Sequence, residues 1–349
     1  MTLSSQTIEQ LRENRNADDK TLLQLLATDE LDELLFFHAD EVRRQIYGDA
    51  VFVRGLIEFS NYCKNNCYYC GIRSGNSAAG RYRLTKEEIL SCCEEGYQLG
   101  MRTFVLQSGE DAYYTDELIC DIVSSIRSKF PDCAVTLSIG EKSRESYQAY
   151  FDAGATRYLL RHEAACDRLY QKLHPGNMSP EHRRQCLYDL KEIGFQTGAG
   201  FMAGAPYQTL PDLVGDLRFL QKLDPDMIGI GPYIRHAQTP FCNCPDGSLT
   251  LSLRLLAIAR LMFPHVLLPA TTALATIAPD GRQRGLKAGA NVVMPNLSPM
   301  HVRGLYNLYE NKNCTGAESA QCSQKLSILI QNSGYRMVTD IGNVNRTQP

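Results

Sequence analysis

The chain has 349 residues, of which 36 are Lys or Arg and 39 are Asp or Glu, so its formal net charge is −3. Hydrophobic residues make up 44% and charged residues 21%, which are ordinary proportions for a globular chain with an ample core. The near-neutral balance gives no electrostatic reason to expect nucleic acid or an anionic membrane as a partner.

The start of the chain and its apolar segments argue against export. Residues 1–20 are polar and charged and lack the apolar stretch of a signal peptide. No segment approaches the roughly 18 apolar residues that span a membrane. The most apolar stretch, residues 266–279, is interrupted by Pro269. We therefore expect a cytoplasmic protein that is neither secreted nor inserted in a membrane.

Helix-like segments begin early and are marked by capping residues. Residues 22–47 have the apolar periodicity of one or two amphipathic helices. Thr85 and Glu88 form the capping-box pattern of a helix start, and Pro180 suits a first helical turn. Further helices are predicted after Ser143, from Thr209 or Pro211, and over residues 251–263 and 281–288.

Short β-rich segments alternate with these helices after Gly48. Strands separated by helical crossovers pair in parallel, and about eight such units in about 250 residues predict an α/β fold, a (β/α)8 TIM-type barrel. A doubly wound open sheet is the alternative. We expect an N-terminal helical segment over residues 1–48, the barrel over 49–310 and a short C-terminal appendix over 311–349. The predicted strands span residues 51–59, 103–107, 134–139, 157–160, 196–202, 227–230, 267–271 and 291–294.

Cysteine is unusually frequent, with 13 residues, and the odd number excludes complete internal disulfide pairing. Without an export signal, metal binding in a reducing compartment is the better interpretation for a cluster of cysteines. Six others lie in helix- or strand-like segments and are interpreted as small buried hydrophobic residues: Cys92, Cys93, Cys120, Cys133, Cys166 and Cys186.

The strongest motif is C-x3-C-x2-C, formed by Cys63, Cys67 and Cys70, with Tyr69 directly before the last cysteine. It follows the first predicted strand, where a barrel places its active-site loops. Three thiolates suit an iron–sulfur cube with one iron left open for a non-protein ligand. A structural zinc site needs four ligands, and no second cysteine or histidine pair has zinc spacing. The motif resembles that of the radical S-adenosylmethionine superfamily, in which the methionyl end of the cofactor chelates the open iron.

A finer resemblance is to the HydE-type maturation enzymes of FeFe-hydrogenases, with biotin synthase and methylornithine synthase as rivals of the same architecture. It implies a 4Fe-4S cluster, S-adenosylmethionine, other hydrogenase maturation proteins, and a reductant such as ferredoxin or flavodoxin. A non-catalytic iron–sulfur scaffold is the alternative from another class. The resemblance is carried by residues 57–61, 81–83, 105–111, 136–141, 157–163, 197–200, 229–232, 236, 239–240, 269–273 and 291–296.

The resemblance also implies a set of residues that bind S-adenosylmethionine. The turn Ser108-Gly109-Glu110 is similar to the short turn whose main chain holds the amino group of the cofactor. Glu163 suits the ribose hydroxyls, and Arg183, rather than its neighbour Arg184, suits the methionyl carboxylate. Gly198, Gly200 and Gly204 would allow a close approach of the backbone to adenine. Tyr69, Gln107 and Ser138 complete the set.

A second set is expected deeper in the barrel and consists of Arg54, Thr136, Arg161, Thr271, Thr272 and Tyr306. These residue types suit a small, polar, anionic molecule. The resemblance identifies it as a small organometallic iron species bearing CO, cyanide and cysteine. Because neighbouring residues on a strand point to opposite faces, at most one of Thr271 and Thr272 should reach this substrate.

One feature departs from the family pattern. Some members carry C-x7-C-x2-C near the C-terminus for an accessory cluster. Here Cys314 and Cys322 keep the first spacing, but Lys325 occupies the third position. We expect no second cluster.

Overall fold

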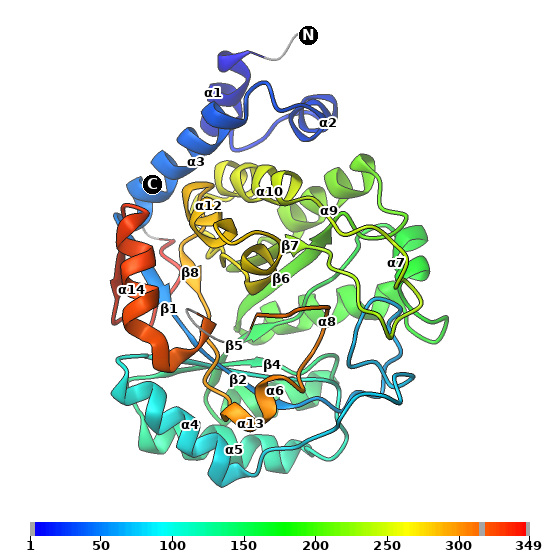
Figure 1. Cartoon of the computed structure of the whole chain (residues 1–349), viewed down its shortest axis with the longest axis vertical. Coiled ribbons are helices and arrows are strands. Elements are labelled where there is room, and N and C mark those ends of the chain that lie inside the picture. Colours follow the sequence, from blue (N-terminus) through cyan, green and yellow to red (C-terminus); the bar gives the residue numbers. More distant parts are fainter. Residues whose placement is uncertain (1–3, 314–317, 347–349) are drawn as a thin grey trace.

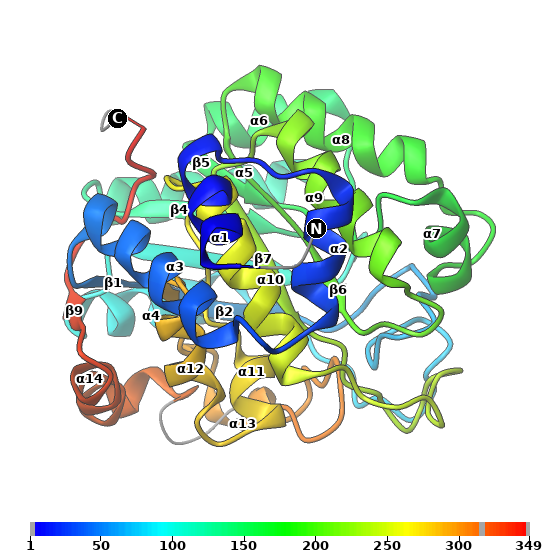
Figure 2. The same ribbon diagram turned by 90° about the horizontal axis from the view of Figure 1, so that it is seen from above.

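The structure, a computed structural model, describes residues 4–313 and 318–346. Three helices precede the barrel and lie together on one side of it, with α3 packed against α10 (Leu249–Met262) (Figures 1 and 2). They are α1 (Ser5–Asn14), α2 (Asp19–Ala27) and α3 (Asp32–Tyr47). No helix in the described ranges is both long and apolar enough to cross a membrane.

Six parallel strands form the larger part of the barrel wall, in the order of the sequence. They are β2 (Gly55–Ser60), β3 (Thr103–Ser108), β4 (Ala134–Ser138), β5 (Ala155–Leu159), β6 (Gln196–Ala203) and β7 (Met227–Pro232).

Single parallel bridges close the wall. Leu267 pairs with Met227 of β7, Pro269 pairs with β8 (Val292–Val293), and Asn296 pairs with Leu56 of β2. The ring is therefore closed, which confirms the (β/α)8 barrel rather than the open sheet.

Two predicted strands differ from the structure. The first divides at Arg54 into β1 (Ala50–Val53) and β2; β1 pairs with β8 and with β9 (Arg336–Val338). The seventh, expected over 267–271, is reduced to single bridges, because Pro269 has no N–H to donate. Thr271 instead caps α11 (Thr272–Ile277).

The capping signals place the crossover helices correctly. Thr85 accepts a hydrogen bond from the Glu88 N–H at 3.2 Å at the start of α4 (Lys86–Gln98), and Ser143 caps α6 (Arg144–Asp152). The other helices are α5 (Asp116–Lys129), α7 (Asp167–Leu173), α8 (Pro180–Ile193), α9 (Leu210–Leu223), α12 (Gly281–Lys287), α13 (Met300–Arg303), the 3-10 turn η2 (Ala320–Cys322) and α14 (Ser323–Asn332).

Alternation along the strands decides which side chains enter the barrel. On β3 and β4, Phe104, Leu106, Val135 and Leu137 pack in the large apolar core between strands and helices. Their neighbours point inward, since successive residues of a strand face opposite sides. Inward positions therefore form layers, with Arg157 and Thr103 near the amino ends of the strands and Gln107 and Ser138 at the carboxyl ends.

Candidate active site

The cysteine loop follows β2 at the carboxyl end of the barrel. Cys63, Cys67 and Cys70 are unpaired by disulfides and partly buried. The Glu110 N–H donates to Cys63 Sγ at 3.4 Å. Burial raises the pKa of all three thiols, to about 12 for Cys70, so binding of a metal must displace their protons.

The loop does not form a site for a single ion. Among the residues that the structure describes, no three His, Cys, Asp or Glu side chains lie close enough together to hold one metal ion. A cube carries its irons at separate corners, so its cysteine ligands are further apart than the ligands of zinc. This arrangement suits a cluster better than mononuclear zinc.

The turn after β3 is packed directly against the cysteine loop. A Cβ on Gly109 would lie 2.2 Å from the Tyr62 carbonyl oxygen and 2.6 Å from Cys63 Cβ, so no larger residue fits. The Lys64 N–H donates to the Glu110 carbonyl at 2.9 Å. The predicted turn 108–110 and the predicted cluster loop are therefore packed together as one unit.

Arg183 faces this unit from α8. Its Nε lies 2.6 Å from Glu141 Oε1, although the two atoms are not aligned for a hydrogen bond. Burial, the largest single influence, would lower the pKa of Arg183, but the neighbouring groups Glu141, Tyr170, Glu110 and Tyr69 together outweigh it and the pKa is raised. The neighbouring Arg184 turns away to Asp167, at 2.7 Å. Glu110 connects the turn after β3 to Glu141, because its Oε1 accepts a hydrogen bond from the Glu141 N–H at 3.0 Å.

Glu163 occupies an unusual backbone conformation just beyond β5. Its φ of +63° lies in the left-handed region, which is uncommon for a residue other than glycine. The Glu163 N–H donates to the Gly200 carbonyl at 3.1 Å, and Glu163 Oε2 lies 3.1 Å from an Arg161 nitrogen. The two side chains are thus brought together at the carboxyl end.

A buried pair that sequence reasoning missed supports this loop. His162 Nε2 lies 3.2 Å from Asp216 Oδ1, and both side chains are fully buried. The same carboxylate oxygen accepts a hydrogen bond from the Ala165 N–H at 2.6 Å. Asp216 is one of two acids on an amphipathic helix, and nothing in the sequence indicates that it meets His162.

Tyr69 is held by a histidine. Its hydroxyl lies 3.2 Å from His174 Nε2, and the His174 ring stacks on Tyr170 with 4.0 Å between centroids. Burial lowers the pKa of His174 to about 3, so the ring is neutral at pH 7. The tyrosine before the last cysteine is therefore fixed against α7.

Most residues of the predicted substrate set gather inside the barrel. Gln107 Nε2 donates to the Tyr306 hydroxyl at 3.3 Å. The Thr272 hydroxyl donates to Glu318 at 3.0 Å, whereas the hydroxyls of Thr136 and Thr271 find no partner within the described ranges. Because Thr271 and Thr272 lie at a helix start, the strand argument does not apply to them.

Arg54 is not brought to this group. It precedes β2 and therefore lies at the amino end of the barrel, where its terminal nitrogens donate to Met227 Sδ at 3.1 Å and to the Gly342 carbonyl at 3.3 Å. The expectation that Arg54 joins the other substrate residues is wrong on this geometry, because Arg54 lies between β1 and β2, at the amino end of β2.

Glu58 and Lys312 form a buried ion pair that was also missed. Glu58 Oε2 accepts a hydrogen bond from Asn296 at 2.8 Å, and Lys312 donates to the Tyr306 carbonyl at 3.1 Å. A carboxylate between Ile57 and Phe59 on a buried strand is a signal that could have identified Glu58. Lys312 lies beyond the predicted end of the barrel, in a segment without a pattern.

The residues considered for a second cluster lie in the C-terminal segment. Cys314 lies outside the described residues. Cys322 is partly buried directly before α14, and Lys325 is exposed on that helix.

Several buried polar atoms around the carboxyl end form no hydrogen bond with any described residue. Glu110 Oε2, Glu141 Oε1, Glu163 Oε2 and Arg183 Nε are among them, but each lies in an ion pair. The hydroxyls of Thr136, Tyr170 and Thr271 have neither kind of partner in the described ranges. Such atoms are costly unless a ligand or water satisfies them, so they fit a polar ligand.

Comparisons with known proteins place the chain in a family. The pattern of the Radical SAM superfamily matches residues 57–220. The chain is 48% identical to the FeFe-hydrogenase maturase subunit HydE of Thermotoga maritima over 90% of this chain and 89% of that protein. It is 32% identical to 3-methylornithine synthase of Methanosarcina acetivorans over 79% and 77% of the two chains. A crystal structure of methylornithine synthase superposes with a TM-score of 0.84 at 27% identity and covers 95% and 97%.

Proposed function

The chain belongs to the HydE family of radical S-adenosylmethionine enzymes, and from this premise we propose that it modifies a small iron-bound molecule during maturation of FeFe-hydrogenase. As a member of the superfamily it is an enzyme that uses a 4Fe-4S cluster and S-adenosylmethionine. Its partners in this proposal are the other hydrogenase maturation proteins and a one-electron reductant such as ferredoxin or flavodoxin.

Cys63, Cys67 and Cys70 would hold the cluster. When bound, the cluster and S-adenosylmethionine supply a one-electron cleavage that yields methionine and a 5′-deoxyadenosyl radical. The backbone of the turn 108–110, wedged against Cys63, would receive the amino group of the cofactor. Arg183 would pair with its carboxylate and Glu163 with its ribose hydroxyls. The expected cofactor site is bordered by Gln107 on β3, by Ser138 at the end of β4 and by Tyr69 in the cysteine loop.

The substrate would bind further inside. The unpaired hydroxyls of Thr136 and Thr271 supply donors, and Arg161 supplies a positive charge for an anionic iron species. Tyr306 and Thr272 already have partners in Gln107 and Glu318, so they would fix the walls around the substrate. These residues orient the substrate and exclude water, and the radical chemistry itself belongs to the cofactor.

The observation that carries this proposal is the fit between the Gly109 turn and the cysteine loop, with unpaired polar atoms beside them. The test is anaerobic turnover of the reconstituted protein with S-adenosylmethionine, a reductant and an iron complex bearing CO, cyanide and cysteine. We expect formation of 5′-deoxyadenosine to depend on the iron complex.

The rival functions are those of the methylornithine synthase and biotin synthase type, because those proteins share the architecture. Parallel reactions with amino-acid substrates and with a biotin precursor distinguish them. Turnover with one of these and none with the iron complex would show that the substrate assignment is wrong, while the radical mechanism stands.

A further inference from the structure

One arginine outside the predicted site connects the two ends of the cysteine loop. Arg81 lies in the segment between the loop and α4, and its guanidinium donates to the backbone carbonyl of Asn61, which precedes Cys63 by two residues. It also donates to the carbonyls of Ile72 at 2.8 Å and Arg73 at 2.8 Å, just after Cys70, and to that of Asn76 at 3.2 Å. One side chain therefore fixes the distance between the entry and the exit of the loop.

The backbone that carries Arg81 is itself held in place. Asn61 Oδ1 accepts a hydrogen bond from the Tyr82 N–H at 2.8 Å, and Asn61 Nδ2 donates to the Gly80 carbonyl at 2.7 Å. Both neighbours of Arg81 are thus bonded to the residue at the start of the loop. The guanidinium is positioned before any cluster binds, which lowers the entropic cost of using it.

The charge of Arg81 is not neutralised by a carboxylate. All four acceptors are neutral carbonyl groups, and no described carboxylate lies within ion-pair distance of Arg81. Arg83, two residues further, differs in this respect, because it forms two hydrogen bonds with Asp111 at 2.7 and 2.9 Å. Arg81 is therefore a cation beside the cluster loop with no carboxylate partner in the described ranges, as is Arg73 at the loop exit, whereas the charge of Arg83 is neutralised by Asp111.

We propose that Arg81 is a positioning residue for the iron–sulfur cluster, which holds the loop ends at the separation that three cysteine ligands need and raises the reduction potential of the cluster by its charge. The proposal rests on the assignment of Cys63, Cys67 and Cys70 as ligands. A nearby positive charge favours the state of the cluster that has gained an electron, and local charge and hydrogen bonding set such potentials. The electron comes from a low-potential one-electron carrier.

The test uses the full chain, reconstituted anaerobically, in the variants Arg81→Lys, Arg81→Gln and Arg83→Gln. The rate of iron release to a chelator measures how firmly the loop retains the cluster. A redox titration followed by electron paramagnetic resonance measures the reduction potential of the cluster. Arg81→Lys keeps the charge but cannot reach four carbonyls, so we expect release about tenfold faster with little change in potential. Arg81→Gln should release iron at least as fast and shift the potential downward. Arg83→Gln should leave iron release unchanged, because Arg83 does not bridge the loop ends. Since it uncovers the Asp111 carboxylate, the control for the potential is the double variant Arg83→Gln/Asp111→Asn, which removes both charges of that pair and should change neither quantity.

Each outcome decides one part of the proposal. Wild-type iron release and potential in Arg81→Gln would overturn it. An equal shift of the reduction potential in Arg81→Lys and Arg81→Gln would overturn the role of the charge. An unchanged rate of iron release in Arg81→Lys would overturn the role of Arg81 in holding the loop ends together. If Arg81→Gln does not fold, iron release from Arg81→Lys still tests whether Arg81 holds the loop ends together. A reduction potential of Arg81→Lys below that of the wild type would then contradict the charge argument. Failure of the ligand assignment is separate, because it would appear as a cluster that survives removal of the three cysteines.

Discussion

The two ends of the barrel treat buried polar groups differently. At the amino end, Arg157 donates to Thr103 Oγ1 at 3.0 Å, to the Ile341 carbonyl at 2.9 Å and to Asn343 at 2.7 Å. The acceptors come from the chain itself, because the C-terminal residues run beneath the strands. At the carboxyl end, the hydroxyls of Thr136 and Thr271 have no partner within the described ranges.

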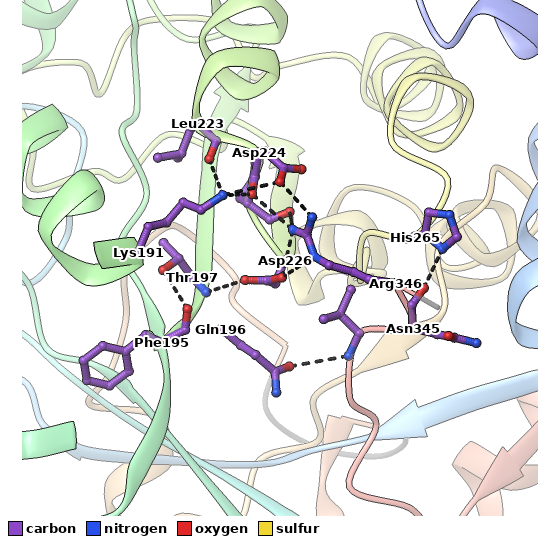
Figure 3. Close-up of polar contacts among 12 residues, drawn as sticks. Lys191, Phe195, Gln196, Thr197, Leu223, Asp224, Asp226, His265, Asn345 and Arg346 are labelled. Carbon is purple, nitrogen blue, oxygen red and sulfur yellow. Dashed lines mark hydrogen bonds and ion pairs between the residues drawn. The ribbon is translucent and has the colours of Figure 1, made fainter. Parts of the chain in front are cut away.

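The C-terminal segment is what closes the amino end. Figure 3 shows Arg346 between Asp224 and Asp226, with Lys191 on the other side of Asp224. In the same view Asn345 meets His265. A buried polar group without a partner costs about 1–3 kcal/mol, so a protein keeps such groups where a ligand will satisfy them. The contrast is one of degree, because Arg54 Nε and Arg157 Nε also lack a partner at the amino end. The unpaired hydroxyls of the carboxyl end differ in that they belong to the predicted substrate set, so we expect the amino end to be structural and the carboxyl end to be functional, as in barrel enzymes in general.

The largest effect should come from removing the cysteine loop's ligands at the functional end. Replacing Cys63, Cys67 and Cys70 together by Ala should abolish both the brown chromophore and cleavage of S-adenosylmethionine. Iron analysis and absorption spectra of the reconstituted variant check this result. A full 4Fe-4S signal in the variant would contradict the assignment.

A matched control concerns the cysteines near the C-terminus. Wild-type protein should bind about four irons per chain, the content of one cubane cluster. Replacing Cys314 and Cys322 together by Ser should leave that number unchanged, because Lys325 stands where a third ligand would be. Additional iron that disappears in this double variant would reveal a second cluster.

The next effect concerns Arg183, which should bind the carboxylate of S-adenosylmethionine. Charge-assisted hydrogen bonds contribute about 1.5–3 kcal/mol, so Arg183→Ala should weaken binding roughly ten- to a hundredfold while the iron content stays intact. Arg183→Lys should recover only part, since Lys lacks the two parallel donors. Equilibrium binding measurements check both.

Arg184→Ala is the control for this prediction. Arg184 pairs with Asp167 at 2.7 Å and points away from the loop, so its loss should leave cofactor binding unchanged. Weaker binding in Arg184→Ala but not in Arg183→Ala would show that the wrong neighbour was chosen.

Glu163 offers a way to separate function from stability at the same end. Its φ of +63° suits glycine, so Glu163→Gly should not lower the free energy of unfolding. Loss of a carboxylate that accepts from the ribose should still weaken S-adenosylmethionine binding about tenfold. Thermal unfolding and binding are measured on the same variant, with Glu163→Gln as the control that keeps the backbone strain. A less stable Glu163→Gly with normal binding would reverse the interpretation of this residue.

The features that could be predicted from the sequence are those with local causes. The spacing of Cys63 and Cys67, the capping by Thr85 and the alternation of β4 depend on residues a few positions apart. Glu58 and Lys312 meet across 254 positions of the chain, and no periodicity encodes such a pairing. The same holds for His162 and Asp216, 54 positions apart.

The misplacement of Arg54 has a different origin. The predicted strand 51–59 was treated as one element, but it divides at Arg54, with β1 paired to β8 and β9 and β2 paired to β3. The pairing with β9 depends on residues 336–338, almost 300 positions away, in a segment whose sequence pattern is weak. Arg54 lies in the amino half of this segment whether or not the strand divides, so its place follows from the strand direction, and tertiary contacts decide only where the strand breaks.

The smallest effect is expected at the structural end, from Arg346. Its guanidinium donates to Asp226 at 3.0 Å and to Asp224 at 2.7 Å, but 44% of the side chain is exposed. Ion pairs that water reaches contribute about 0–1 kcal/mol, so Arg346→Ala should lower the melting temperature by no more than about 2–4 °C. Iron content and S-adenosylmethionine affinity should equal those of the wild type, because none of the unpaired groups of the carboxyl end contacts Arg346. Arg336→Ala, which breaks the more exposed pair with Asp49, is the control for a purely superficial contact. A loss of cofactor affinity in Arg346→Ala, without such a loss in Arg336→Ala, would mean that the C-terminal segment acts on the functional end and that the two ends are not independent.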